Sequence, residues 1–282
     1  MRKVSQLMFF SFVGVQLLGL FVGWNFIQLA GMGLVPTIFE NPADLFNAVK
    51  LFAYIIFSVI LLFAVLYFYK GKRLFLVLEL LIIFASVQLF FIILLPEWTP
   101  APDLAVSVPA ILAVALRWKY PQTKTAFLLF SSAIVGPYIG AAFDVTSPDF
   151  VVGPAILAVL IFALYDVIAV FVTKHMVTLA RELEKREAAF AVFFSRDKES
   201  VQLGTGDLVL PAILITSSLK LSLFHSLFAL AGAAFGLIFM IYLLEKKRGY
   251  YPALPPIILF SLIFLAVYQL LELFVKPVLS LV

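Results

Sequence analysis

The stretch Ala163-Leu164-Tyr165-Asp166-Val167-Ile168 places one aspartate in an apolar run that is long enough to cross a membrane. Further along, Gly204-Thr205-Gly206-Asp207-Leu208-Val209 opens a second apolar run, again with a single aspartate in it. A carboxylate within a lipid-embedded helix costs about 2.5–3.5 kcal/mol on insertion scales, so intramembrane acidic residues are rare and indicate functional sites. These two segments therefore point both to a membrane protein and to the place where its function lies.

The composition is that of a polytopic helical membrane protein. The 282 residues are 64% hydrophobic and only 13% charged, about half the charged share of a typical soluble domain. Apolar stretches of about 20 residues recur along the chain without the alternation of a transmembrane β-barrel. The net charge of +4 does not indicate nucleic acid, because the charges lie in short loops between the apolar runs.

Cysteine chemistry is excluded, because the chain has no cysteine. Disulfides, thiolate metal sites and cysteine nucleophiles therefore cannot occur. The two histidines, His175 and His225, are too few for a typical histidine-based zinc site. We expect neither a metal nor another cofactor.

We predict an all-α fold in which the whole chain, 1–282, forms a single membrane domain with nine transmembrane helices. Helices 1–6 lie within 1–173, a cytoplasmic linker occupies 174–202, and helices 7–9 lie within 203–282. The first apolar run is too long for the core of a signal peptide, so it is predicted to be a retained span. The linker is mixed in charge, which favours a solvated helix or flexible segment, with a cover or entry element for the site as the alternative. The predicted spans are about 7–30, 47–69, 74–95, 101–116, 125–144, 150–173, 203–219, 222–244 and 253–280.

The loop charges orient this array. Alternate loops, beginning with Arg2 and Lys3 at the N-terminus, hold 17 of the 20 basic residues, and the opposite loops are mainly acidic. Cytoplasmic loops carry an excess of Lys and Arg, so the N-terminus is predicted to be cytoplasmic and the C-terminus outside.

Asp166 and Asp207 are predicted to lie at the same depth. Asp166 comes eight residues before Lys174 and Asp207 seven residues after Ser200, or ~12 Å and ~10 Å along a helix. Two carboxyl groups that lie close together cannot both ionise easily, so the pair shares a proton and titrates as a unit. Such a pair suits peptide hydrolysis, because the charged member can take a proton from water while the protonated member polarises the scissile carbonyl.

The residues around this pair favour a substrate site. Gly204 and Gly206 remove side-chain bulk beside Asp207, so a substrate backbone or a facing helix could approach closely. Tyr251-Pro252-Ala253-Leu254-Pro255-Pro256 comes just after a cytoplasmic basic cluster, at a similar depth. Its three prolines are expected to interrupt the helix and leave backbone groups for an extended substrate. Proline punctuation at a helix start is the structural alternative, and the favoured one for this segment alone.

These motifs resemble those of the presenilin and signal peptide peptidase family of intramembrane aspartyl proteases. Tyr165-Asp166, Gly204-Thr205-Gly206-Asp207 and Pro252-Ala253-Leu254 match the family's Tyr-Asp, Gly-x-Gly-Asp and Pro-Ala-Leu motifs in order. With Pro255, the last motif is similar to the Pro-Ala-Leu-Pro of presenilins. The cytoplasmic N-terminus also resembles presenilin. The motif similarity covers roughly 150–280.

The resemblance implies an aspartic endopeptidase that needs no cofactor and cleaves transmembrane or signal-peptide-like segments near the cytoplasmic side. Asp166 and Asp207 would be the catalytic pair. Thr205 stands where the family usually has an apolar residue, which leaves the side-chain preference near the cut open. The short loops are similar to those of microbial homologues and imply the cell membrane of a microbe. Residues that would shape the site and bind substrate are Tyr165, Gly204, Thr205, Gly206, Pro252, Ala253 and Leu254.

Membrane aspartates also occur in proteins with other functions. A proton- or cation-coupled transporter or a cation leak channel would also use membrane aspartates. Such a protein is expected to have internal symmetry or polar residues along several spans, neither of which is evident here. A noncatalytic scaffold would leave the cost of two membrane aspartates unexplained. The expected partners are the lipid bilayer and the substrate, not nucleic acid, and homo-oligomer formation is left open.

Three further sequence features have structural interpretations. Glu79 is expected to reach back toward Lys72 or Arg73 at the membrane interface. The motifs Gly19-x-x-x-Gly23 and Gly232-x-x-x-Gly236 are expected to be close contacts between helices.

Overall fold

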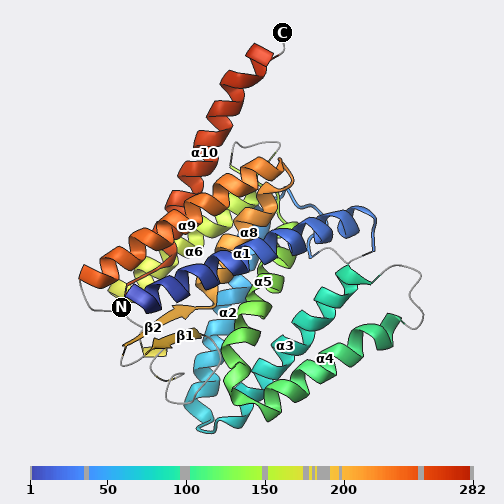
Figure 1. Cartoon of the computed structure of the whole chain (residues 1–282), viewed down its shortest axis with the longest axis vertical. Coiled ribbons are helices and arrows are strands. Elements are labelled where there is room, and N and C mark those ends of the chain that lie inside the picture. Colours follow the sequence, from blue (N-terminus) through green and yellow to red (C-terminus); the bar gives the residue numbers. More distant parts are fainter. Residues whose placement is uncertain are drawn as a thin grey trace.

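The computed structural model describes residues 2–34, 38–95, 102–147, 152–173, 178–179, 182, 191–196, 199–246 and 251–279. The fold is mostly helical (Figure 1). The helices are α1 (Arg2–Gly31), α2 (Phe46–Phe68), α3 (Arg73–Leu94), α4 (Pro102–Lys119), α5 (Lys124–Ala141), α6 (Pro154–Val167), α8 (Gly206–Ser218), α9 (Leu223–Lys246) and α10 (Leu254–Leu279). A 3₁₀ turn (Pro121–Thr123) precedes α5, a π-helical turn (Ile168–Val172) extends α6, and two strands, β1 (Ala191–Arg196) and β2 (Glu199–Gly204), precede α8.

Seven segments of the described chain are helical, long and apolar enough to cross a membrane. They correspond to α1, α2, α3, α5, α6, α9 and α10, each within a predicted span or overlapping it. The protein is therefore an integral, multi-pass membrane protein. The remaining two predicted spans, 101–116 and 203–219, form the less apolar α4 and the shorter α8.

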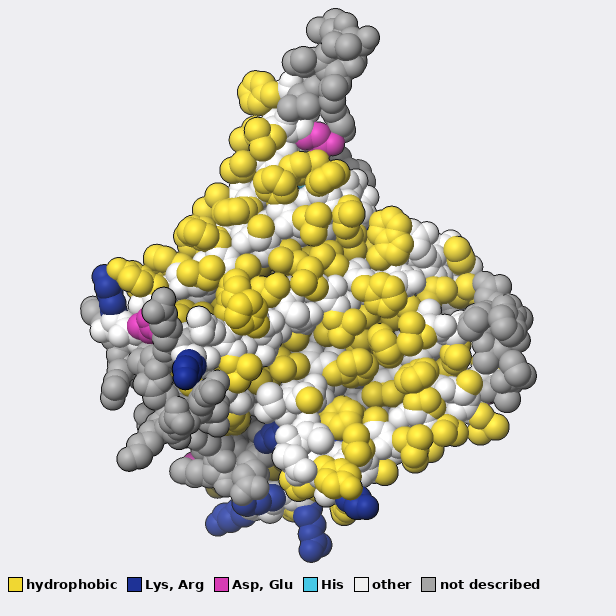
Figure 2. Space-filling model, in the orientation of Figure 1, with side chains coloured by type: hydrophobic (Ala, Val, Ile, Leu, Met, Phe, Trp, Pro, Cys, Tyr) yellow, Lys and Arg dark blue, Asp and Glu magenta, His cyan; other side chains and the backbone are white. Residues whose placement is uncertain are grey.

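The molecular surface supports this assignment. Figure 2 shows apolar side chains over most of the face in view, with Lys and Arg side chains at its left and lower edges. Large exposed residues such as Phe57, Tyr67 and Phe274 lie on the helices that bound the bundle. Exposing such side chains to water is unfavourable, whereas contact with lipid is favourable.

The short helix α8 lies at the centre of the bundle (Figure 1). Its residues Leu210–Ser218 are all buried. It packs against α1, α5, α6, α9 and α10. Because a helix that is apolar on every side must be covered on every side, the surrounding helices fix the place of α8 in the bundle.

Glycines bring neighbouring helices unusually close. A Cβ at Gly136 or Gly140 of α5 would stand 2.9 Å or 2.7 Å from the carbonyl oxygens of Val209 and Ile213 in α8. The predicted packing role of Gly19-x-x-x-Gly23 and Gly232-x-x-x-Gly236 is confirmed. Gly23 abuts Thr216 of α8, and Gly232 and Gly236 abut the backbone of α10.

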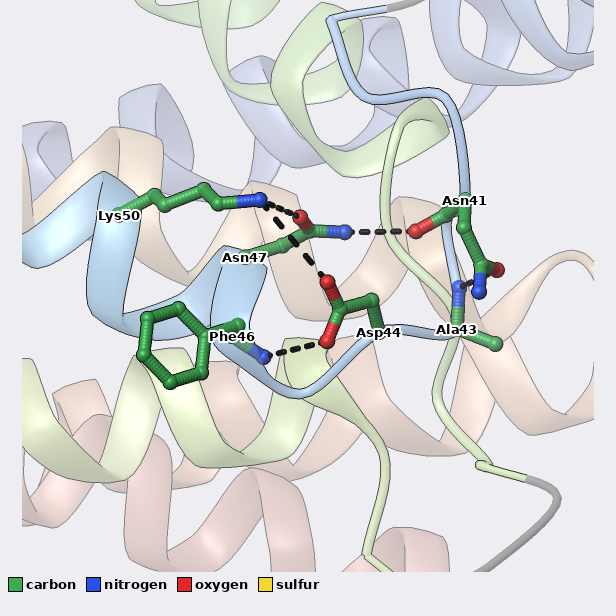
Figure 3. Close-up of polar contacts among 6 residues, drawn as sticks. All are labelled: Asn41, Ala43, Asp44, Phe46, Asn47 and Lys50. Atoms are coloured by element: carbon green, nitrogen blue, oxygen red, sulfur yellow. Dashed lines mark hydrogen bonds and ion pairs between the residues drawn. The ribbon is translucent and has the colours of Figure 1, made fainter.

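A polar network secures the loop that enters α2 (Figure 3). Asp44 Oδ1 accepts the backbone N–H of Phe46 at 2.9 Å, and Asn47 Nδ2 donates to the carbonyl of Asn41 at 2.7 Å. Lys50 Nζ lies 3.5 Å from Asn47 Oδ1 and 3.9 Å from Asp44 Oδ2. These contacts satisfy backbone groups at the helix start, where intrahelical partners are missing.

The prediction for Glu79 was wrong. The side chain does not reach back to Lys72 or Arg73, but forms a buried ion pair with Arg117 of α4. The side chains of Glu79 and Arg117 are only 3% and 7% exposed. A single buried charge would have a large desolvation cost, and pairing the two charges reduces it. The sequence could not reveal this contact, because it depends on how α3 and α4 pack.

The segment before α8 departs from the all-α prediction. Within the described residues of the predicted linker 174–202, β1 and β2 pair antiparallel, with Ala191 opposite Gly204 and Arg196 opposite Glu199. Val192, Phe194 and Leu203 are buried in the same cluster as residues of α1 and α8. The linker was predicted to be a solvated helix or a flexible segment, but pairing between its two halves and burial against α1 stabilise strands there instead. The strand continues to Gly204, and so α8 starts at Gly206 rather than 203.

Candidate active site

The residues of the predicted site lie on three helices or on the segments that lead into them, and these helices pack together. The helices α6, α8 and α10 contribute Phe162, Leu210 and Leu254 to one buried hydrophobic cluster. Phe162 lies one helical turn before Asp166, and Leu210 lies one turn after Asp207. Direct packing of α6 against both α8 and α10 therefore brings the three sequence motifs to one region.

Asp166 connects α6 to the start of α10. Its Oδ2 accepts the backbone N–H of Leu254 at 3.3 Å. The first N–H groups of a helix have no intrahelical partner, and a carboxylate at this end is also favoured by the helix dipole. The contact joins the Tyr-Asp and Pro-Ala-Leu motifs, which lie 88 residues apart in the chain.

Asp207 lies in the first turn of α8 and folds back on the preceding strand. Its Oδ2 accepts the backbone N–H of Gly204 at 3.1 Å. Asp207 and Asp166 are both partly buried, and they are close enough to interact electrostatically. The structure thus brings the two aspartates together as the sequence predicted, each with its Oδ2 held by a backbone donor.

The two glycines of the Gly-x-Gly-Asp motif have different surroundings. A Cβ at Gly204 would lie 3.0 Å from Asp207 Oδ2, so the carboxylate occupies the space that a side chain would need. A Cβ at Gly206 would meet no atom within 4 Å. Gly204 therefore permits the hydrogen bond to Asp207, whereas Gly206 leaves open space beside it. Thr205 is partly buried, and its carbonyl accepts the N–H groups of Leu208 and Val209 at the helix start.

The Pro-Ala-Leu segment is partly an interruption of the helix and partly a proline-rich helix start, the two structures that the sequence allowed. Pro252 and Ala253 are buried and not helical, as expected. The interruption is shorter than expected, because α10 begins at Leu254 and includes Pro255 and Pro256 in its first turn, where proline is tolerated. Of this segment, Leu254 makes the direct contact with Asp166.

Tyr165 faces a neighbour that the sequence did not identify. Its ring packs edge-on against Phe52 of α2, with centroids 5.8 Å apart, and Phe52 also packs against Phe162. This aromatic group fixes the face of α6 that precedes Asp166. No motif or spacing in the sequence indicates Phe52, because it is one of many apolar residues in α2.

A π-helical turn, Ile168–Val172, extends α6 and begins two residues after Asp166. The N–H of Thr173 donates to the carbonyl of Ile168, five residues earlier, at 3.0 Å. Such turns are rare and often lie at functional sites, because they widen the helix and leave backbone groups accessible. Hydrophobic periodicity could not predict it, since every residue of Ile168–Val172 is apolar.

The comparisons with known proteins agree with this arrangement. The family model described as signal-peptide peptidase, presenilin aspartyl protease matches residues 10–267. Two solved structures of a presenilin family intramembrane aspartate protease are similar in fold. The first is 23% identical in sequence, and the match has a TM-score of 0.69 and covers 95% of this chain and 99% of the solved chain. The second is 24% identical in sequence, and the match has a TM-score of 0.63 and covers 92% of this chain and 97% of the solved chain.

No curated protein matches the chain. The family model nevertheless spans nearly the whole sequence, including all three motifs of the site. The chain therefore belongs to the signal-peptide peptidase and presenilin family of intramembrane aspartyl proteases.

Proposed function

We propose that Asp166 and Asp207 are the catalytic pair with which this intramembrane aspartyl endopeptidase hydrolyses peptide bonds in transmembrane segments. The observation that carries the proposal is the convergence of the two carboxyl groups at the packed ends of α6, α8 and α10. The transporter alternative has no supporting observation.

The proposed reaction uses the oxygen of each aspartate that the backbone does not hold. The backbone N–H groups of Leu254 and Gly204 engage the Oδ2 atoms, and we assign the Oδ1 atoms to the shared proton and the water. The ionised aspartate takes a proton from water as the water oxygen bonds to the scissile carbonyl carbon. The protonated aspartate donates a hydrogen bond, then its proton, to the carbonyl oxygen. As the tetrahedral intermediate collapses, the aspartate that is now ionised takes a proton from one of the hydroxyl groups of the intermediate, the C–N bond breaks, and the aspartate that received the water proton gives it to the leaving amine.

The residues around the pair are proposed to position the substrate. The open space at Gly206 and the non-helical backbone at Pro252 and Ala253 lie beside the two aspartates. A substrate must be extended at the cut, because a helix hides its own carbonyl groups in hydrogen bonds. We propose that Gly206 admits the extended segment, with Tyr165, Gly204, Thr205 and Leu254 shaping the rest of the site.

We also propose the finer topology: nine spans, including the short α4 and α8, with the N-terminus in the cytoplasm and the C-terminus outside. The grouping of Lys and Arg side chains along the left and lower edges of the face in Figure 2 supports this orientation. On the opposite side, Lys50 lies near Asp44, and Lys220 pairs with Asp144 at 2.7 Å. The loops of that side hold only Lys50, Lys220 and Lys276 of the 20 basic residues, and this low number of Lys and Arg is what the positive-inside rule requires. We propose that the enzyme lies in the cell membrane of a microbe and cuts near its cytoplasmic face.

The test of the catalytic pair is cleavage of a model transmembrane substrate by the purified protein in detergent. Asp166→Asn and Asp207→Asn each keep the shape of the side chain and remove its acid–base function, so each is expected to abolish cleavage. Asp103→Asn is the matched control, because Asp103 is an exposed carboxylate in the first turn of α4. Undiminished cleavage by either site variant would refute the assignment, provided that Asp103→Asn behaves like the wild type.

A further inference from the structure

A buried glutamine of α1 contacts the backbone next to Asp207. Gln16 is only 1% exposed. Its side-chain Nε2 donates a hydrogen bond to the carbonyl oxygen of Leu208 at 3.0 Å. Leu208 directly follows Asp207 and is fully buried. The contact therefore reaches from α1 into the first turn of α8.

The first turn of α8 lacks one hydrogen bond within the helix. Pro211 has no N–H, so the carbonyl of Asp207, four residues earlier, loses its intrahelical donor, and the proline ring crowds that carbonyl. The Thr205 side chain makes no capping hydrogen bond. Contacts from outside the helix must therefore fix the direction of this turn and of the side chain that it carries.

The Gln16 contact is not explained by stability alone. Its Oε1 is buried and has no hydrogen-bond partner among the described residues. A buried unpaired polar atom is destabilising, so an apolar side chain of similar size would serve the packing as well or better. The consequence of the amide is geometric: it holds one carbonyl, and with it the start of α8, at a fixed distance from α1.

We propose that Gln16 is a positioning residue for catalysis, which orients the first turn of α8 so that the Asp207 carboxyl group faces Asp166. The inference rests on the proposed catalytic role of Asp207. Gln16 itself does not touch the reacting atoms. It acts through the Leu208 carbonyl.

The chain offers a matched control at the other end of the same helix. Ser226 of α9 is fully buried, and its Oγ donates to the carbonyl oxygen of Ile215 in α8 at 2.9 Å. This hydrogen bond is of the same kind, but Ile215 lies two turns beyond Asp207. Loss of this bond should affect the packing of α8 without turning the Asp207 side chain.

The experiment compares Gln16→Leu with Ser226→Ala in kcat, KM and Tm, using the full-length enzyme and a model transmembrane substrate. Gln16→Leu is expected to lower kcat about five- to tenfold, the effect of one lost buried hydrogen bond, with KM and Tm unchanged. Its bell-shaped pH profile should also narrow, because a less well aligned pair interacts less strongly. Ser226→Ala is expected to retain the kcat and the pH profile of the wild type.

The inference is overturned if a folded Gln16→Leu enzyme keeps the wild-type kcat and pH profile. It is overturned equally if both variants lose kcat in proportion to Tm, because the effect would then be general packing. Gln16→Met, unbranched and of similar length, replaces Gln16→Leu if leucine prevents folding. An active Asp207→Asn enzyme would refute the catalytic assignment itself, whereas an inactive Asp207→Asn with a fully active Gln16→Leu would refute only the role of Gln16.

Discussion

At the scale of single residues, the site depends on which oxygen atoms the backbone holds. The Leu254 N–H binds Asp166 Oδ2, and the Gly204 N–H binds Asp207 Oδ2. A hydrogen bond from a backbone donor fixes a carboxyl group in direction as well as in position. The proposed catalytic pair is thus held by two backbone donors, one in the first residue of α10 and one just before α8, and small changes there should alter activity more than stability.

Gly204→Ala is the sharpest test of this arrangement. The new Cβ would lie 3.0 Å from Asp207 Oδ2, and the carboxylate, as the end of a flexible side chain, would shift rather than the backbone. We expect a folded protein with nearly unchanged Tm and cleavage reduced by about tenfold or more, since small displacements of a catalytic group are costly. In Gly206→Ala the new Cβ would lie in the open space that is proposed to admit the substrate, with no atom of the protein within 4 Å. This variant should therefore raise KM or change the cut position instead. Wild-type kcat in Gly204→Ala would contradict the account.

The pH dependence of cleavage tests the shared proton. At low pH both aspartates are protonated, and neither can take a proton from water. At high pH both are ionised, and neither can donate to the carbonyl oxygen. The rate of the chemical step should therefore rise and then fall with increasing pH, with limbs that belong to the pair. The measurement is the single-turnover rate in detergent, and a rate that stays constant from acid to alkaline pH would contradict the mechanism.

At the scale of elements, apolar length and composition predict helices well and predict their partners poorly. The two aspartates, both glycines and the Pro-Ala-Leu segment could be identified from the sequence, because a charge or a proline in an apolar run is conspicuous. The β1–β2 hairpin, the π-helical turn after Asp166 and the contact of Phe52 with Tyr165 could not. Each of these depends on tertiary packing, which overrides local propensity and leaves no periodic pattern.

The ion pair between α3 and α4 gives a prediction at this scale. Arg117→Met leaves the buried Glu79 carboxylate without its partner and should lower the free energy of unfolding by about 3–5 kcal/mol. The double variant Glu79→Leu/Arg117→Met removes both charges and should recover most of this loss. Denaturation of the detergent-solubilised protein measures both. Equal destabilisation in the single and double variants would show that the pair is not the cause.

At the scale of the whole molecule, the position of the site follows from the central place of α8. Because α8 is covered by the surrounding helices, its first turn and Asp207 lie within the bundle near the end where β1 and β2 lie (Figure 1). A site within the apolar bundle but near one face can admit both a membrane segment and water. Whether that face is cytoplasmic depends on the proposed orientation of the chain in the membrane.

Labelling with a membrane-impermeant maleimide tests the orientation directly, because the chain has no cysteine of its own. Lys70 follows α2, Glu40 precedes it, and both residues are exposed. In intact cells, Glu40→Cys should react from outside, and Lys70→Cys should react only after permeabilisation. The reverse pattern would place the site near the outer face, and reaction at both positions in intact cells would refute a span between them.

The most direct test of the central claim is a double-mutant comparison of cleavage rates for Asp166→Asn, Asp207→Asn and the double variant. Two aspartates that act on one water work as a unit, so the first substitution should remove nearly all of the rate enhancement. The account predicts that all three variants have the same residual rate, within error, under single-turnover conditions. Independent, multiplicative losses, in which the double variant is slower by the product of the two single effects, would contradict it.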